Sequence, residues 1–102
     1  MVNFLDETIK CLQENGKAEK DVLWVGRGFN RYCTSKYKST WEDFQYKANF
    51  MYDECYGDNK IPMDLVIVGK DFWLERHEYD GAEWCEFKTL PKIPSEMKEL
   101  TL

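Results

Sequence analysis

The sequence predicts a single α+β domain, residues 1–102, in which two helices pack on a three- to four-stranded, mainly antiparallel sheet. Apolar residues recur at helical spacing near the N-terminus and again after residue 40. Three β-prone segments joined by turn residues follow between residues 64 and 89, which is typical of a C-terminal β-meander. A chain of 102 residues has room for one modest hydrophobic core.

The first helix is predicted from an apolar stripe in which residues recur at four and then three positions, namely Leu5, Ile9 and Leu12. The side chain of Asn3 can accept a hydrogen bond from a free backbone amide and cap this helix. Gly16 is expected to end the helix, because glycine adopts the left-handed conformation at little steric cost. Residues 22–25 are β-prone and predict a fourth strand.

A second helix is predicted to begin at Ser39 or Thr40. Ser39 and Glu42 have the spacing of a capping box, in which each side chain satisfies one backbone amide. The residues expected to face the sheet are Trp41, Phe44, Ala48 and Met51.

The meander begins with residues 65–68, a continuous apolar run typical of a central strand. Residues 72–79 form the next strand, and Asp80-Gly81 predicts a two-residue hairpin turn. The residue numbers of each opposing pair then sum to 161. One face carries the pairs Tyr79 with Ala82, His77 with Trp84, Glu75 with Glu86, and Trp73 with Lys88, while the core-facing side carries Phe72, Leu74, Arg76, Cys85 and Phe87. After Leu90 we expect an irregular tail, with a terminal turn or helix at residues 96–102.

The aromatic and acidic face of this hairpin has two interpretations. Two glutamates directly opposite each other cost about 0.2–1 kcal/mol, which a purely structural sheet has little reason to keep. Either the C-terminal segment or a helix covers the tryptophans, or the face recognises a basic partner protein through aromatic anchors and carboxylates. The candidate partner-binding residues are Trp73, Glu75, His77, Tyr79, Trp84 and Glu86, with Asp53, Glu54 and Asp58 as an acidic extension.

Catalysis is not expected, although Glu75, His77 and Glu86 leave a small acid-base hydrolase as a weaker alternative. A two-strand surface offers no cleft, and the predicted register places Cys85 on the opposite face, so no nucleophile accompanies the imidazole. No cofactor or metal is expected either. The four cysteines form no CxxC pair, and the acidic loop before the meander lacks the order of an EF-hand.

The net charge of −5 is unevenly distributed. Residues 51–86 contain ten acidic and three basic residues, which disfavours binding of a phosphate backbone there. Residues 27–38 interleave aromatic residues with cations, and leave open the alternative of a nucleic-acid-binding accessory protein that uses Arg27, Arg31, Lys36 and Lys38. The sequence shows neither a membrane-spanning apolar run nor a secretion signal, so we expect a cytoplasmic protein.

The block DLVIVGKDFWLERHEYDGAEWCEFKTLP, with FMYDECYGDNKI before it, resembles a group of short proteins of phages and mobile elements of Gram-positive bacteria. The resemblance covers residues 50–91, and Cys85 departs from it where a larger aromatic residue is expected. No activity is assigned to the group. Because small acidic proteins of such elements often occupy a host protein, the resemblance implies an inhibitor or modulator of a bacterial host or defence protein, such as a CRISPR nuclease with a basic groove. The sequence leaves the oligomeric state open.

Overall fold

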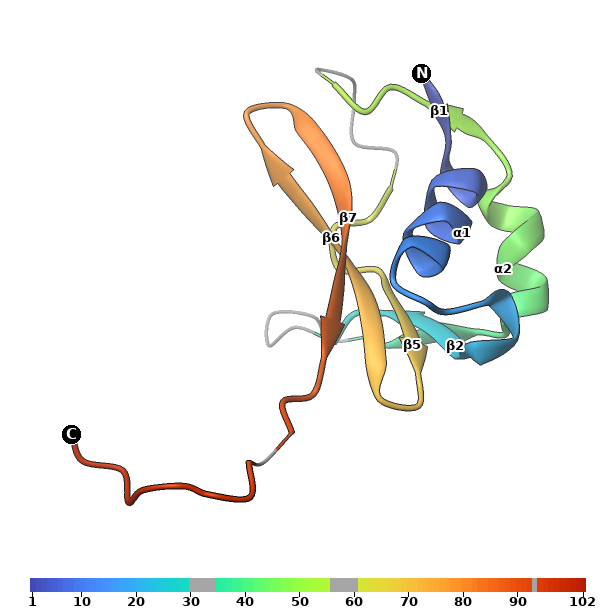
Figure 1. Ribbon diagram of the computed structural model, residues 1–102. Coiled ribbons are helices and arrows are strands. Elements are labelled where there is room, and N and C mark those ends of the chain that lie inside the picture. Colours follow the sequence, from blue (N-terminus) through green and yellow to red (C-terminus); the bar gives the residue numbers. More distant parts are fainter. Residues whose placement is uncertain (30–34, 56–60, 93) are drawn as a thin grey trace.

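The computed structural model describes residues 1–29, 35–55, 61–92 and 94–102, and it confirms the predicted α+β fold. Figure 1 shows both helices on the same side of the sheet. In chain order the described elements are β1 (Val2–Asn3), α1 (Phe4–Glu14), a short 3-10 helix (Glu19–Asp21), β2 (Val22–Arg27), β3 (Tyr37–Ser39), α2 (Trp41–Ala48), β4 (Met51–Tyr52), β5 (Val66–Gly69), β6 (Phe72–Tyr79) and β7 (Ala82–Thr89).

Five of these strands form one antiparallel sheet in the order β3-β2-β5-β6-β7. This is one strand more than predicted, because β3 pairs with β2 through Val25 and Ser39. The remaining two strands, β1 and β4, pair with each other and bring Tyr52 opposite Val2. The chain that follows α2 therefore lies beside the N-terminus.

The predicted hairpin turn at Asp80-Gly81 is confirmed. Both residues have positive φ, 51° for Asp80 and 84° for Gly81. This combination is required by a type I′ turn, whose twist matches the twist of the flanking strands. The eight β6–β7 pairs follow the predicted register, from Tyr79 with Ala82 to Phe72 with Thr89.

Helix α1 begins as predicted, because the side chain of Asn3 accepts a hydrogen bond from the amide of Asp6 at 3.0 Å. Its buried face is turned by about one position from the predicted stripe. Phe4, Thr8 and Leu12 are buried, whereas the predicted Leu5 and Ile9 are only half-buried. The cause is aromatic packing around Phe4, whose ring contacts those of Phe44, Phe50 and Tyr52 at 5.8, 5.7 and 6.1 Å between centroids.

Helix α2 begins after Thr40, one of the two predicted start residues, but its capping pattern and its C-terminal end differ from the prediction. The cap is Thr40, whose hydroxyl accepts from the amide of Asp43 at 3.1 Å, so the capping box predicted for Ser39 and Glu42 is wrong. Phe44 and Ala48 are buried as expected. Met51 is exposed, because the helix ends at Ala48 and Met51 belongs to β4.

The C-terminal tail has no helix or strand among its described residues, and it runs away from the body of the protein (Figure 1). The tail is irregular after Leu90 as predicted, but the terminal turn or helix expected at residues 96–102 is absent. A seven-residue segment without a packed apolar face is too short to sustain a helix. Among the helices of the described residues, none is long and apolar enough to span a membrane.

A buried charged network joins the sheet to α1 and β4. The guanidinium of Arg76 is 3% exposed, forms an ion pair with Glu7 and donates to the Tyr52 hydroxyl at 3.0 Å. Tyr52 in turn donates to Glu7 at 2.6 Å. Burial opposes the charge of Arg76, but the hydrogen bonds with Tyr52 and Glu7 outweigh it and raise the pKa of the guanidinium. Glu83 lies 3.7 Å from Arg76, and burial raises the pKa of its carboxyl against the opposing effect of Arg76.

Arg76→Ala is expected to lower the free energy of unfolding by about 3–5 kcal/mol, because it leaves the carboxylate of Glu83 buried without its counter-ion. Urea unfolding measures this difference. Lys10→Ala removes an exposed pair with Glu14 and is expected to change stability by less than about 0.5 kcal/mol. Similar losses for the two variants would show that the buried network contributes little.

Gly81→Val is expected to destabilise the hairpin by about 1–3 kcal/mol, because a β-branched residue is strained at positive φ. Asp80→Asn is the matched control, since asparagine tolerates the same backbone conformation. Urea denaturation midpoints that are equal for Gly81→Val and the unchanged protein would contradict the turn geometry.

Candidate functional site

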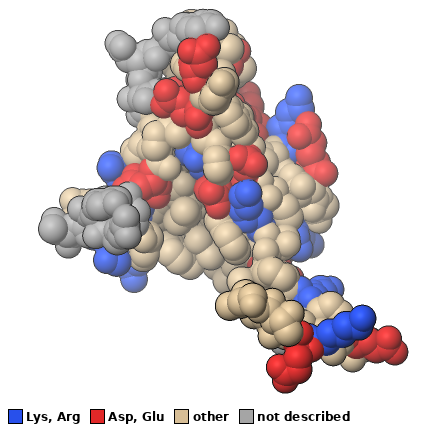
Figure 2. Space-filling model, turned by 90° about the vertical axis from the view of Figure 1, so that its left-hand side faces the viewer, with Lys and Arg blue, Asp and Glu red and all other residues tan. Residues whose placement is uncertain are grey.

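The sheet face opposite the helices, called here the outer face, is where the predicted site residues meet. The strand register places Trp24, Val68, Trp73 and Lys88 in one row across four strands, and Gly26, Val66, Glu75 and Glu86 in the next. The outer face thus comprises these residues together with Phe29, His77, Tyr79 and Trp84. Figure 2 shows acidic side chains at the top and in the middle of this side, with basic side chains beside the middle ones and mostly uncharged surface below them.

Trp24 and Phe29 form an aromatic pair on the outer face that the sequence analysis missed. Their ring centroids lie 5.4 Å apart. A β-carbon at Gly26 would lie 2.3 Å from the Trp24 ring and 2.8 Å from that of Phe29, so only glycine leaves room for both rings over this position of the strand. Strand alternation is the signal that was available, because an inward Val25 requires Trp24 to point outward.

An imidazole lies between the two opposed glutamates. His77 Nε2 is 2.8 Å from Glu75 Oε2, and His77 Nδ1 is 3.0 Å from Glu86 Oε2. A neutral imidazole can donate from one nitrogen only, whereas an imidazolium donates from both. In either state the imidazole can donate to at least one of the two carboxylates, so His77 relieves part of the repulsion expected between Glu75 and Glu86.

Glu75 is further held by the indole of Trp73, which donates to Glu75 Oε1 at 2.7 Å. Burial opposes ionisation of Glu75, but the hydrogen bonds from Trp73 and His77 outweigh it and lower the pKa of the carboxyl. On the neighbouring strand, Lys88 Nζ lies 3.7 Å from Glu86 Oε1. Glu75 thus uses both of its oxygens to orient neighbouring rings.

The aromatic side chains at the hairpin end are accessible. Trp84 is 38% exposed and Tyr79 is 78% exposed. Trp84 also stacks on His77, with the ring centroids 6.2 Å apart and the planes at 22°. Both helices lie on the other side of the sheet and the tail leads away, so the interpretation that one of them covers the tryptophans is wrong for the described residues (Figure 1).

The acidic extension lies beside the hairpin. The amide of Glu83 donates to the carbonyl of Glu54 at 2.8 Å, and Cys55 bridges to Ala82. Asp53 is exposed in the same segment. Asp58 falls outside the described residues. Glu83 itself is buried on the helix side of the sheet and is not part of the outer face.

The geometry of the outer face gives little support to the alternative that the protein is a small acid-base hydrolase. A shallow hollow of about 340 Å³ includes Glu75 in its lining but neither His77 nor Glu86. Cys85 faces the helices as predicted, and its interaction with Cys11 and its burial raise the pKa of the thiol. Within the part of the chain that the structure describes, no cluster of three or more His, Cys, Asp or Glu side chains is suited to hold a metal.

The described residues of the basic segment, residues 27–38, do not form one continuous surface. Arg27 and Tyr37 are paired neighbours on the helix side, with the guanidinium 5.9 Å from the ring centroid. Arg27 Nε also lies 3.3 Å from Asp64 Oδ1. Lys38 instead pairs with Gly26 in the row that belongs to the outer face. Lys36 is exposed, and Arg31 falls outside the described residues.

Compared with protein-family models, curated proteins and solved structures, the chain has no match in any of the three. The candidate site is thus defined by the physical features of the outer face.

The free energy of unfolding of Glu75→Gln is expected to depend less on pH in the acidic range than that of the unchanged protein. The pKa of Glu75 is lowered in the fold from 4.5, so its contribution is present above that value and is lost as the pH falls through the folded-state pKa. The difference in unfolding free energy between the unchanged protein and Glu75→Gln should therefore be larger at pH 7 than at pH 3. Urea titrations at several pH values test this, with Glu96→Gln in the exposed tail as control. A difference that does not change with pH would exclude the hydrogen-bonded carboxylate.

Proposed function

We propose that this chain is a non-catalytic protein-binding domain that docks its outer face on a partner protein with a basic surface. The observation that carries the proposal is the uncovered set of aromatic side chains at the β6–β7 hairpin, led by Trp84 and Tyr79. Tryptophan and tyrosine are enriched among the residues that dominate binding energy. Contiguous exposed apolar surface on a soluble domain commonly marks an interaction site.

Two of the aromatic side chains, Trp73 and Trp84, are held in place before any partner binds. Glu75 fixes the indole of Trp73 through a hydrogen bond, and His77 stacks on Trp84 while it contacts both glutamates. Ordering a free side chain at an interface costs about 0.5–1.5 kcal/mol. Rings already held in one orientation avoid part of that cost, which supports a binding role for the network.

The negative charge of the protein supports a partner with a basic surface. The chain carries a net charge of −5, and Asp53 and Asp80 are exposed beside or at the hairpin turn. Unlike Glu75, these carboxylates lie outside the Trp73–His77 network. A field of one sign accelerates association with a surface of the opposite sign and makes the rate dependent on salt.

The resemblance of residues 50–91 to phage and mobile-element proteins suggests the class of partner. We propose an inhibitor or modulator of a bacterial host or defence protein, acting in the cytoplasm of the host cell. A nuclease with a basic nucleic-acid groove, such as a CRISPR nuclease, offers the complementary charge. An acidic domain with aromatic anchors can occupy such a groove in place of nucleic acid.

Tyr79→Ala and Trp84→Ala are expected to weaken partner binding by about tenfold or more each, because each removes a large exposed anchor. Tyr46→Ala is the matched control, since Tyr46 on α2 is 80% exposed and lies away from the outer face. A tagged domain first captures its partner from a bacterial lysate, and calorimetry with the purified partner then measures the affinity of each variant.

Equal affinities for Tyr79→Ala, Trp84→Ala and Tyr46→Ala would remove the outer face as the docking surface. Thermal unfolding of the three variants shows that any loss is not due to misfolding. We expect small changes in melting temperature for Tyr79→Ala and Tyr46→Ala, which are 78% and 80% exposed, and a somewhat larger one for Trp84→Ala, which loses its stacking on His77.

A further inference from the structure

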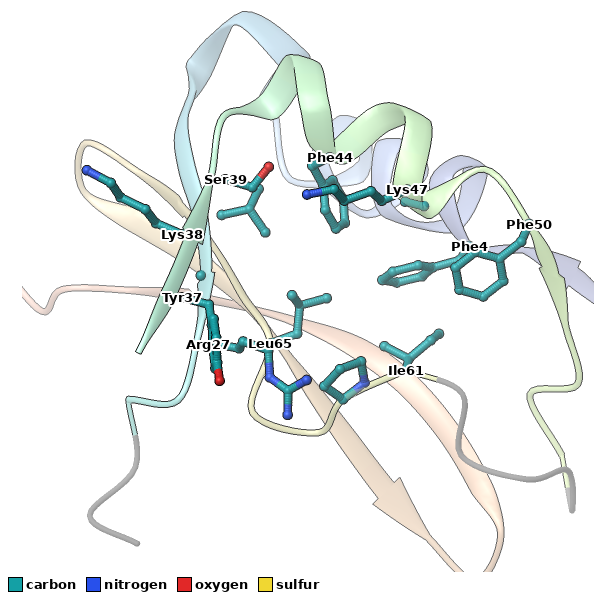
Figure 3. A pocket seen from close by; sticks show the side chains of 14 residues that line it. Phe4, Arg27, Tyr37, Lys38, Ser39, Phe44, Lys47, Phe50, Ile61 and Leu65 are labelled. Carbon is teal, nitrogen blue, oxygen red and sulfur yellow. The ribbon is translucent and has the colours of Figure 1, made fainter. Parts of the chain in front are cut away.

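A second feature lies on the helix side of the sheet. Between α2, the β2–β3 edge and the residues that lead into β5, a cavity of about 240 Å³ opens to the surface (Figure 3). Its walls are mainly apolar and come from Phe4, Val25, Phe44, Phe50, Ile61 and Leu65. A cavity of about 150 Å³ is enough to hold a benzene molecule in an engineered protein core.

The cavity follows from the residues around it. Ala48 is buried on the sheet-facing side of α2 and contributes only a methyl group to the cavity wall. Phe4 and Phe44 pack edge to face at 84° and form a firm wall. Apolar atoms that line a hollow lack dispersion partners, so an apolar guest of the right size gains contacts there.

The charges around the cavity have the opposite sign to the chain as a whole. Among the described residues, its lining includes Arg27, Lys38 and Lys47 but no acidic residue, in a chain of net charge −5. The side chain of Lys38 points away from the cavity, and Arg27 is paired with Asp64 (Figure 3). Lys47 lies at the opening and has no ion-pair partner among the described residues.

We propose that this pocket binds a small amphipathic carboxylate, with a short alkyl chain or a single ring in the hollow and the carboxylate beside Lys47. An uncompensated ammonium next to an apolar cavity matches the two halves of such a ligand, because charged hydrogen bonds are about twice as strong as neutral ones. The site lies on the opposite side of the sheet from the outer face, so it does not depend on the proposed protein docking.

Octanoate is the probe, with 1-octanol as the uncharged molecule of equal chain length and acetate as the head group alone. Amide chemical shifts followed by NMR during titration are expected to change in a saturable way at Phe44, Ala48 and Phe50. Octanoate should bind about fivefold or more tightly than octanol, and acetate should cause no saturable change.

Lys47→Glu is expected to weaken octanoate binding by about fivefold or more while leaving octanol binding unchanged. Lys98→Glu, in the exposed tail, is the matched control and should have no effect on either. Equal affinities for octanoate and octanol, or an unchanged octanoate affinity in Lys47→Glu, would overturn the proposal. So would shifts that do not saturate at the lining residues.

Ala48→Leu tests the hollow itself, because the added side chain projects into it. We expect loss of octanoate binding together with a lower melting temperature, because Ala48 is only 1% exposed and the larger side chain must displace its neighbours. Retained binding in a folded Ala48→Leu protein would place the ligand elsewhere. Should this core substitution fail to fold, the exposed Lys47→Glu variant still decides the question.

Discussion

The two positive φ angles at Asp80 and Gly81 close the β6–β7 hairpin with two residues, and this constraint determines which side chains reach either side of the sheet. Strand side chains alternate, so a shift of the pairing by one residue would exchange the two faces. Because β6 also pairs with β5, β7 is the strand that would flip: Trp84 and Glu86 would turn toward the helices, and Phe87 would turn toward solvent. The hydrophobic core and the outer face therefore depend on the same turn.

Strand alternation in β6, where Phe72 and Leu74 are buried, also requires Arg76 to lie inside. The cost of burying a guanidinium is offset by Glu7 from α1 and Tyr52 from β4, and partly by Glu83 from β7. A buried pair of this kind adds little net stability compared with apolar residues, yet removing one partner is costly. Because its partners come from three elements, the Arg76 network fixes how α1 and the β1–β4 pair dock on the sheet.

Local signals predicted most of the fold, and long-range packing explains the rest. The Asp80-Gly81 turn and the Asn3 cap depend on neighbours in sequence, and both could be recognised from residue type. Strand β3 has only three residues and is stabilised by pairing with β2, which no local pattern reveals. In the candidate site, strand alternation predicted that Glu75 and Glu86 lie on the same face of the sheet. That His77 contacts both of them could not be predicted, because residue spacing does not contain side-chain geometry.

The sequence assigned both aromatic anchoring and recognition of a basic partner to one set of residues around Glu75 and Glu86. Because these two glutamates already contact His77, the two roles fall to different residues. A carboxylate that already holds an indole and an imidazole gains little from a new cation, since its hydrogen bonds would have to be exchanged. Aromatic contacts at Trp84 and Tyr79 should then govern the dissociation rate of a complex, because short-range contacts act mainly after docking. The exposed carboxylates of Asp53 and Asp80 act at longer range and should govern the association rate and its salt dependence. Affinity and steering thus arise from different residues of the hairpin and of the segment beside it.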